Sequence, residues 1–131
     1  MMDGYLLDTH FLIWWRQGNT RKLGKAKAFI EANKCFVSPV SIWEMRQKER
    51  SAQLDLPPGD LMEDFSRTGF IEIPLASAHV EAAFALNAMH ADFCDRLLVA
   101  TAKVSGLTFV TCDGEILGRA AAHLRGRLIE I

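Results

Sequence analysis

The sequence has few cysteines, and their spacing does not suggest a disulfide framework or a zinc ribbon. Cys35, Cys94 and Cys112 are the three cysteines of the chain, so they cannot all pair, and none forms a C-x-x-C motif. We therefore expect reduced thiols.

Long hydrophobic runs are also missing. No apolar segment approaches the roughly 18 residues that a membrane span needs. The opening residues, MMDGYLLDTH, lack the basic segment that begins a signal peptide. We therefore expect no membrane association and a cytoplasmic protein. Repeats, low-complexity segments and linkers are absent as well, so residues 1–131 are expected to form one domain.

An excess of positive charge is the third absence. Lysine and arginine total 15 against 16 acidic residues, which leaves a net charge of −1. A protein that binds nucleic acid through its overall charge is usually basic, so any such binding here requires a local patch. The candidate phosphate contacts are Arg46, Lys48, Arg96 and Arg119, with Arg50, Arg125 and Arg127 as further basic residues. For any one of them alone, a solvated surface is the more usual explanation.

Short apolar segments alternate with longer segments of helical periodicity. The short segments, which we interpret as strands, cover residues 4–7, 35–37, 70–73, 107–111 and 128–131. Ser77 is expected to cap an alanine-rich helix that runs to about Met89. This alternation predicts an α/β fold with a central parallel sheet of four or five strands and helices on both faces.

Two acids lie one helical turn apart at the start of the segment HADFCDRLLVATAK. Asp92 and Asp95 share a helix face, and the residues after them are apolar enough to require burial. Asp92 fits a helix N-cap, and Asp95 fits the positive end of the helix dipole. However, an aspartate two residues before the apolar run Leu97-Leu98-Val99 lies close to the core, which also fits a functional site.

Three more acids stand at or near the ends of predicted strands, and each has a local structural explanation. Asp8 follows the first strand and could cap a helix, and Asp113 belongs to an Asp-Gly turn. Glu44 completes a capping box with Ser41, unless the helix begins at Ser38 and leaves Glu44 inside it. With Asp95, these residues would gather at the carboxyl edge of the sheet, where open α/β sheets place their sites.

Four carboxylates in one pocket repel one another and call for a cation. Oxygen ligands favour Mg²⁺ or Mn²⁺, which typically combine a few carboxylates with water and phosphate oxygens. Such a site suits the hydrolysis of phosphodiester bonds.

The segments LLDTHFLIWW, SPVSIWEMRQK and DFCDRLLVATAKVSGLTFVTCD, with the terminal strand, together resemble PIN domains over essentially the whole chain. Within that family they look like the VapC-type toxins of bacterial toxin–antitoxin pairs. The resemblance implies a PIN-like domain and a metal-dependent ribonuclease that uses Mg²⁺ or Mn²⁺. It assigns Asp8, Glu44, Asp95 and Asp113 as the acidic quartet and Asp92 as an accessory acid. It further implies an RNA substrate, a small inhibitory antitoxin and a homodimer.

The chain departs from the family pattern at two cysteines beside the acids. Cys94 lies in Asp92-Phe93-Cys94-Asp95, where relatives often have Asp-Pro-Phe-Asp, and Cys112 replaces a frequent arginine. With His10 or His90, these cysteines would offer ligands for a softer metal, although their spacing is not that of a zinc site.

Two other functions fit parts of the sequence. A haloacid-dehalogenase-like phosphatase also begins with an aspartate after its first strand and would use Gly59–Asp64 as a late acidic motif. That family requires a second aspartate where this chain has His10. A metal-free interaction domain would instead use exposed Trp14, Trp15 or Trp43 to bind a partner.

Overall fold

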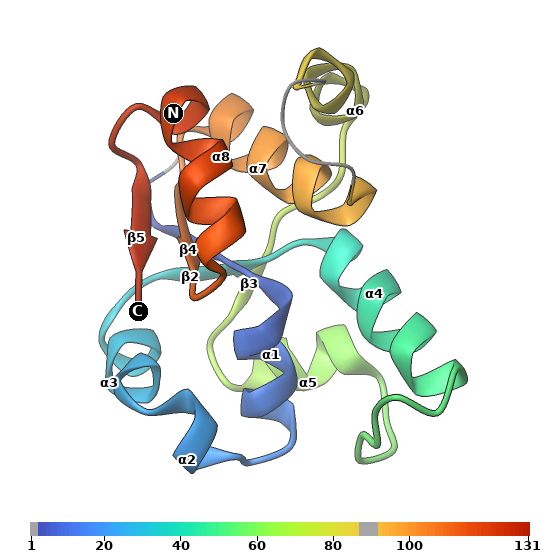
Figure 1. Ribbon diagram of the computed structural model, residues 1–131. Helices are drawn as coiled ribbons and strands as arrows, with labels where there is room; N and C mark the ends of the chain where they lie inside the picture. The colour runs from blue at the N-terminus through green and yellow to red at the C-terminus, as the bar shows by residue number, and fades with distance from the viewer. Residues whose placement is uncertain (1–2, 87–91) are drawn as a thin grey trace.

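The computed structural model describes residues 3–86 and 92–131, and it confirms the predicted α/β architecture (Figure 1). The strands are β1 (Tyr5–Leu7), β2 (Cys35–Val37), β3 (Ile71–Glu72), β4 (Thr108–Thr111) and β5 (Leu128–Glu130). The helices are α1 (Thr9–Arg16), α2 (Thr20–Leu23), α3 (Lys25–Ala32), α4 (Pro39–Arg50), α5 (Leu61–Arg67), α6 (Ser77–Ala85), α7 (Phe93–Ser105) and α8 (Gly114–Leu124).

The five strands form one sheet in the order β3-β2-β1-β4-β5, and every neighbouring pair is parallel. β1 lies at the centre, with Leu6 opposite Phe36 on one side and Phe109 on the other. The last strand of the chain lies at an edge, as predicted. Because all strands run the same way, the residues that follow β1, β2 and β4 emerge along one edge of the sheet.

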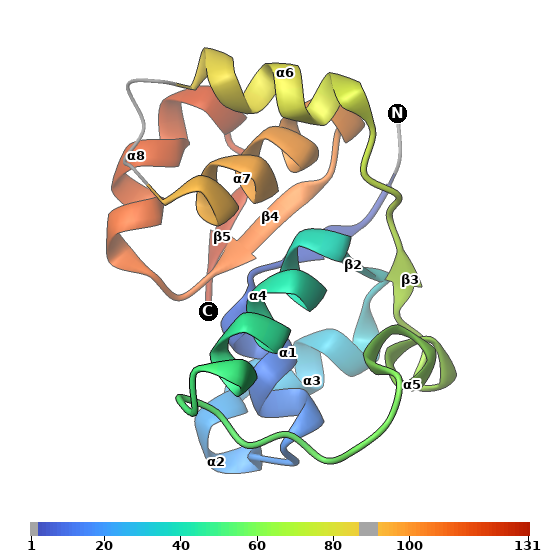
Figure 2. The same cartoon turned by 90° about the vertical axis from the view of Figure 1, so that its right-hand side faces the viewer.

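Helices cover both faces because neighbouring residues of each strand point to opposite sides. Leu6, Phe36 and Phe109 pack in one core cluster with residues of α6, α7 and α8. The next residue of β1, Leu7, packs in the other cluster with residues of α1, α2, α3 and α5. Figure 2 shows these two groups of helices on opposite sides of the strands, with α4 beside them.

Side-chain caps fix where the helices after these strands begin. Asp8 caps α1, Ser38 caps α4 and Asp113 caps α8, each with backbone dihedrals in the extended region. Asp92 caps α7 by accepting a hydrogen bond from the Asp95 backbone N–H at 3.1 Å. The caps therefore place acids at the starts of three helices.

The prediction for the cap of α6 was wrong. Ala76 occupies the N-cap position and Ser77 is the first helical residue. No side chain in the described part of the chain caps the first N–H groups of this helix; instead the buried His79 ring reaches back, and its Nδ1 accepts the Ala76 backbone N–H at 3.1 Å. The helix ends at Ala85, and the rest of the segment predicted up to Met89 lies outside the described residues from position 87. None of the helices in residues 3–86 and 92–131 is long and apolar enough to cross a membrane.

Candidate active site

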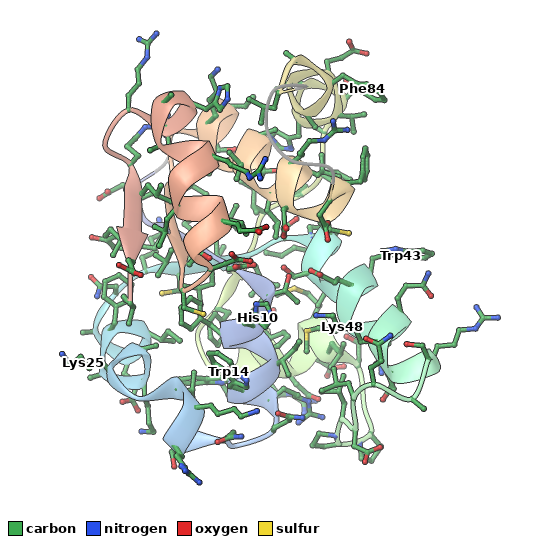
Figure 3. The ribbon with its side chains drawn as sticks, in the orientation of Figure 1. His10, Trp14, Lys25, Trp43, Lys48 and Phe84 are labelled. Carbon is green, nitrogen blue, oxygen red and sulfur yellow. The ribbon has the colours of Figure 1, made fainter. Side chains whose placement is uncertain are left out.

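The four predicted site acids come from four different helix starts at the carboxyl edge of the sheet. Asp8 follows β1 directly, and Asp113 lies two residues after β4. Glu44 lies in the second turn of α4, and Asp95 lies in the first turn of α7. Figure 3 shows side-chain oxygen atoms gathered where α1, α4, α7 and α8 approach one another.

Asp8 is the most buried and most firmly held of these acids. Its side chain is almost fully buried, with 2% of the residue exposed. Oδ1 accepts the Thr9 backbone N–H at 2.7 Å, and Oδ2 accepts the Thr111 hydroxyl at 2.6 Å. Burial raises the pKa of the Asp8 carboxyl, and the Thr111 hydrogen bond opposes that rise.

The Thr111 hydroxyl also connects Asp8 to Asp113. Its oxygen accepts the Asp113 backbone N–H at 3.0 Å while its proton is donated to Asp8. Asp113 Oδ1 in turn accepts the Glu115 backbone N–H at 2.9 Å. One threonine thus sets the relative positions of the acids that follow β1 and β4.

Glu44 lies inside α4 rather than in a capping box. The helix begins after Ser38, whose Oγ accepts the Val40 N–H at 3.1 Å. Ser41 is fully buried and bonds the Thr9 hydroxyl at 2.9 Å, so it does not cap Glu44. Glu44 Oε1 is buried without a hydrogen-bond partner among the described residues. A buried carboxylate oxygen without a donor is costly, which makes it a strong candidate ligand for a cation.

Asp95 carries the clearest electrostatic sign of a gathered acidic site. Burial raises its pKa to about 7, with further contributions from the charges of Asp92, Asp8, Glu44 and Asp113. The carboxylates are therefore close enough to repel one another. Asp92 contributes to this field while its own Oδ1 serves as the cap of α7.

The donor set fits a hard divalent cation. It consists of carboxylate oxygens, includes the unpartnered Glu44 Oε1, and has the mutual repulsion that a cation would relieve. As they stand, however, no three acidic, histidine or cysteine side chains within residues 3–86 and 92–131 are close enough to hold one ion. The structure brings the acids to one edge, and their closure onto a cation is a proposal made below.

The two cysteines beside the acids are held as neutral thiols in the metal-free protein. Burial raises the pKa of Cys94 to about 11 and also raises the pKa of Cys112, and nearby carboxylates add to both shifts. His10 stacks on Trp14 with ring centroids 5.8 Å apart. His90, the other proposed soft-metal ligand, lies outside the described residues.

The basic side chains expected to contact RNA differ in how far other groups of the protein already bind them. The Arg46 guanidinium forms an ion pair with Glu49 at 2.9 Å and donates a hydrogen bond to the Gly59 carbonyl at 2.7 Å. Lys48 lies 3.9 Å from Glu44. Arg96 follows Asp95 directly, stacks over Phe93 at 5.9 Å, and has a buried Nε without a hydrogen-bond partner among the described residues.

Arg119 is exposed on α8, and Arg127 has a structural role instead. The Arg127 guanidinium donates to the Ala102 and Leu107 carbonyls at 3.1 and 3.0 Å, which ties the last strand to the end of α7.

The acids of the alternative phosphatase motif have other structural roles. Asp60 caps α5, Asp64 pairs with Arg16 at 2.8 Å, and Glu63 pairs with Arg67. They belong to a cap and ion pairs around α5, away from the helix starts that carry the acidic site.

The three tryptophans do not form one exposed surface. Trp14 and Trp15 are half-buried against the core, whereas Trp43 is 63% exposed. Figure 3 shows Trp43 on the outer side of α4. The ring borders an apolar hollow lined by Pro39, Val40, Leu75, Phe93, Cys94 and Leu97. The hollow reaches the start of α7, because its lining residues Phe93 and Cys94 directly precede Asp95.

Sequence reasoning did not identify the hydroxyl residues that support the acids. Thr9, Ser41 and Thr111 are each 1% exposed or less. Their sequence signal is a hydroxyl one to three residues from an acid within an otherwise apolar segment: Asp8-Thr9, Ser41-x-x-Glu44 and Thr111-x-Asp113. Buried polar groups require partners, and here the partners are the site or each other.

Replacing Thr111 by valine is expected to destabilise the protein and to disturb the site. The shape is preserved, but Asp8 Oδ2 loses its donor and the Asp113 backbone N–H loses its acceptor. Each buried unsatisfied group costs about 1–3 kcal/mol, so we expect a loss of about 2–4 kcal/mol. Urea unfolding measures it, with Thr108→Val, at the half-buried start of the same strand, as the control. A loss for Thr111→Val no larger than for Thr108→Val would contradict this role.

Comparisons with known proteins agree with this architecture. The PIN domain family model matches residues 5–122. No curated protein matches the chain. Among solved structures, a toxin–antitoxin complex from Klebsiella pneumoniae is 20% identical, with a TM-score of 0.63 over 97% of this chain and 99% of the other.

Two further solved structures share the fold. VapBC2 from Rickettsia felis, bound to a DNA fragment from its promoter, is 13% identical with a TM-score of 0.65 and covers 99% and 98% of the two chains. FitAcB from Neisseria gonorrhoeae is 18% identical with a TM-score of 0.57 and covers 88% and 92%. The family match spans most of the sequence and includes all four acids of the site, so this chain belongs to the PIN domain family.

Proposed function

We propose that this protein is a metal-dependent endoribonuclease whose acidic quartet holds Mg²⁺ or Mn²⁺. The observation that carries the proposal is the gathering of Asp8, Glu44, Asp95 and Asp113 at one sheet edge, where burial and then the charges of the neighbouring acids raise the pKa of Asp95 to about 7. Membership of the PIN family supports a nuclease, since that family is of nuclease type. The resemblance to VapC-type toxins supports RNA as the substrate.

The proposed role of each of the four acids follows from how firmly its side chain is held. Asp8 is fixed by Thr9 and Thr111 and would serve as the rigid anchor of the cation. Glu44 would bind the cation through its unpartnered Oε1 from α4. Asp95 from α7 and Asp113 from α8 would supply the other carboxylate ligands. A bound divalent ion lowers the pKa of an attacking water and offsets charge on the phosphate oxygens.

We further propose that the protein is a VapC-like toxin neutralised by a small antitoxin, and that it forms a homodimer. The solved structures that share its fold include a toxin–antitoxin complex and VapBC2. The exposed Trp43 and the apolar hollow beside it support a protein partner. A partner there would contact the start of α7, which carries Asp95, so a basic side chain from it could reach that acid and block cleavage. The same surface is what an interaction domain without catalytic activity would use.

Cleavage of a structured RNA in Mg²⁺, Mn²⁺ or chelator tests the enzymatic proposal. We expect cleavage with either cation and none in chelator. Glu44→Gln should lower the rate by about 10²-fold or more, as loss of one group that stabilises the transition state typically does. Glu81→Gln is the matched control, because Glu81 is exposed on α6. Cleavage that persists in chelator, or equal rates for Glu44→Gln and the control, would contradict the proposed site.

A further inference from the structure

Lys48 lies one helical turn after Glu44 on the same face of α4. Its Nζ is 3.9 Å from Glu44 Oε2, with the two side chains 30% and 18% exposed. This distance permits electrostatic attraction but exceeds that of a hydrogen bond. The ammonium group therefore keeps its three N–H donors available for other acceptors.

The helix that carries Lys48 also packs against α7, whose first turn carries Asp95. Figure 3 shows Lys48 on the side of α4 that faces α1, opposite the outward side that carries Trp43.

Other cations do not share this position. Arg46 is held by Glu49 and the Gly59 carbonyl, and Arg127 is held by carbonyls near the end of α7. Within residues 3–86 and 92–131, Lys48 is the one lysine or arginine at ion-pairing distance from an acid of the quartet.

We propose that Lys48 is a positioning residue with two alternating partners: it neutralises Glu44 in the free protein and binds a phosphate oxygen of RNA when Glu44 turns to the cation. This inference rests on the proposed ribonuclease function. A loose ion pair suits such an exchange, because an attraction at 3.9 Å without a hydrogen bond is weak enough for a divalent cation to displace. The released ammonium would then be free to bind a phosphate oxygen, which lysine does readily as a point charge.

If Lys48 alternates between these partners, a neutral side chain at position 48 should change the affinities for the divalent ion and for RNA in opposite directions. Without Lys48, Glu44 has no competing cation, so the free protein should bind a divalent ion more tightly. Without Lys48, RNA loses one phosphate contact, so it should bind more weakly. A lysine that merely supported the helix would not strengthen ion binding while weakening RNA binding.

Calorimetric titration of Mn²⁺ without RNA tests the first half. Lys48→Met should bind Mn²⁺ about two- to fivefold more tightly than the wild type, as expected for removal of one surface ion pair. Lys48→Gln is a second neutral variant, and Lys25→Met is the control because Lys25 is exposed on α3, away from the acids. Mn²⁺ affinity of Lys48→Met equal to or below that of the wild type would overturn the inference.

Steady-state cleavage at several salt concentrations tests the second half. We expect KM for RNA to rise about five- to tenfold in Lys48→Met with kcat nearly unchanged, as for loss of uniform substrate binding. The slope of log(1/KM) against log salt should decrease by about one, and Lys48→Arg should restore KM. An unchanged KM and salt slope would overturn the exchange.

The two proposals fail in different ways. If the wild type itself shows no Mn²⁺ binding, the proposed metal-dependent function fails and the inference with it. If the wild type binds Mn²⁺ and cleaves RNA while Lys48→Met matches it in both measurements, only the inference about Lys48 fails.

Discussion

Asp95→Asn is expected to make the metal-free protein more stable while abolishing RNA cleavage. In the folded protein the pKa of Asp95 is raised from 3.8 to about 7, first by burial and then by the charges of Asp92, Asp8, Glu44 and Asp113. Asparagine has nearly the same shape and no charge. The substitution therefore relieves repulsion in the free protein and removes a ligand from the proposed cation site.

The pH dependence of this effect follows from the direction of the pKa shift. Asp95 ionises above about pH 4 in the unfolded chain but only above about pH 7 in the folded protein. Between these values the folded state binds more protons, so stability falls as pH rises. Because solvent screens this partly exposed carboxylate, we expect a gain of about 1–2 kcal/mol for Asp95→Asn at pH 8 and no gain near pH 4.

Thermal melts in chelator at pH 4, 6 and 8, with a Mg²⁺ cleavage assay, measure both parts of this prediction. Asp55→Asn is the control, since Asp55 is exposed in the segment between α4 and α5. If Asp95 mainly served the dipole of α7, asparagine would cost about 0.3–1 kcal/mol and leave cleavage intact. A destabilised, active variant would therefore refute the site.

Gly4→Ala is expected to lower the stability of the protein strongly. Gly4 precedes β1 with φ at +142°, a conformation that residues with a side chain rarely adopt. An added Cβ would lie 2.7 Å from Phe36 Cε2 and 2.8 Å from the Lys34 backbone oxygen. That oxygen accepts the Tyr5 N–H at 2.9 Å, so it cannot move away without disturbing the β1–β2 pairing.

We expect Gly4→Ala to cost about 3 kcal/mol or more, from backbone strain and overpacking together. For a domain of this size the loss corresponds to a melting temperature about 10 °C lower. Gly118→Ala is a matched control, because nothing lies within 4 Å of its added Cβ on α8. Alanine there should stabilise the helix by about 0.5–1 kcal/mol. Similar melting temperatures for the two variants would contradict the close approach at Gly4.

Sequence patterns predicted the sheet well because its strands are short and buried on both faces. In β1, β2 and β4, successive residues such as Leu6 and Leu7 enter different core clusters, which explains why these segments are apolar without alternation. The parallel order and the carboxyl-edge position of Asp8 and Asp113 followed from that reading. Strand lengths were overestimated at β3, where only Ile71 and Glu72 pair.

Local patterns could not decide between interpretations that depend on tertiary contacts. The capping box of Ser41 and Glu44 was plausible from spacing alone, but Ser41 bonds Thr9 of another helix. Similarly, Ser77 has the chemistry of a cap, yet it is the first helical residue, and the buried His79 ring accepts the backbone N–H of Ala76 before it. The link from Asp113 through Thr111 to Asp8 spans about a hundred residues of sequence, so no local pattern could reveal it.

Titration of Mn²⁺ into the metal-free protein, followed by calorimetry, tests the central claim that the four acids form a cation site. We predict measurable binding for the wild type and for Asp55→Asn, and at least tenfold weaker binding for Asp95→Asn, a loss typical of removing one ligand or its support. No heat at millimolar Mn²⁺ for the wild type, or the same affinity for Asp95→Asn, would contradict the claim.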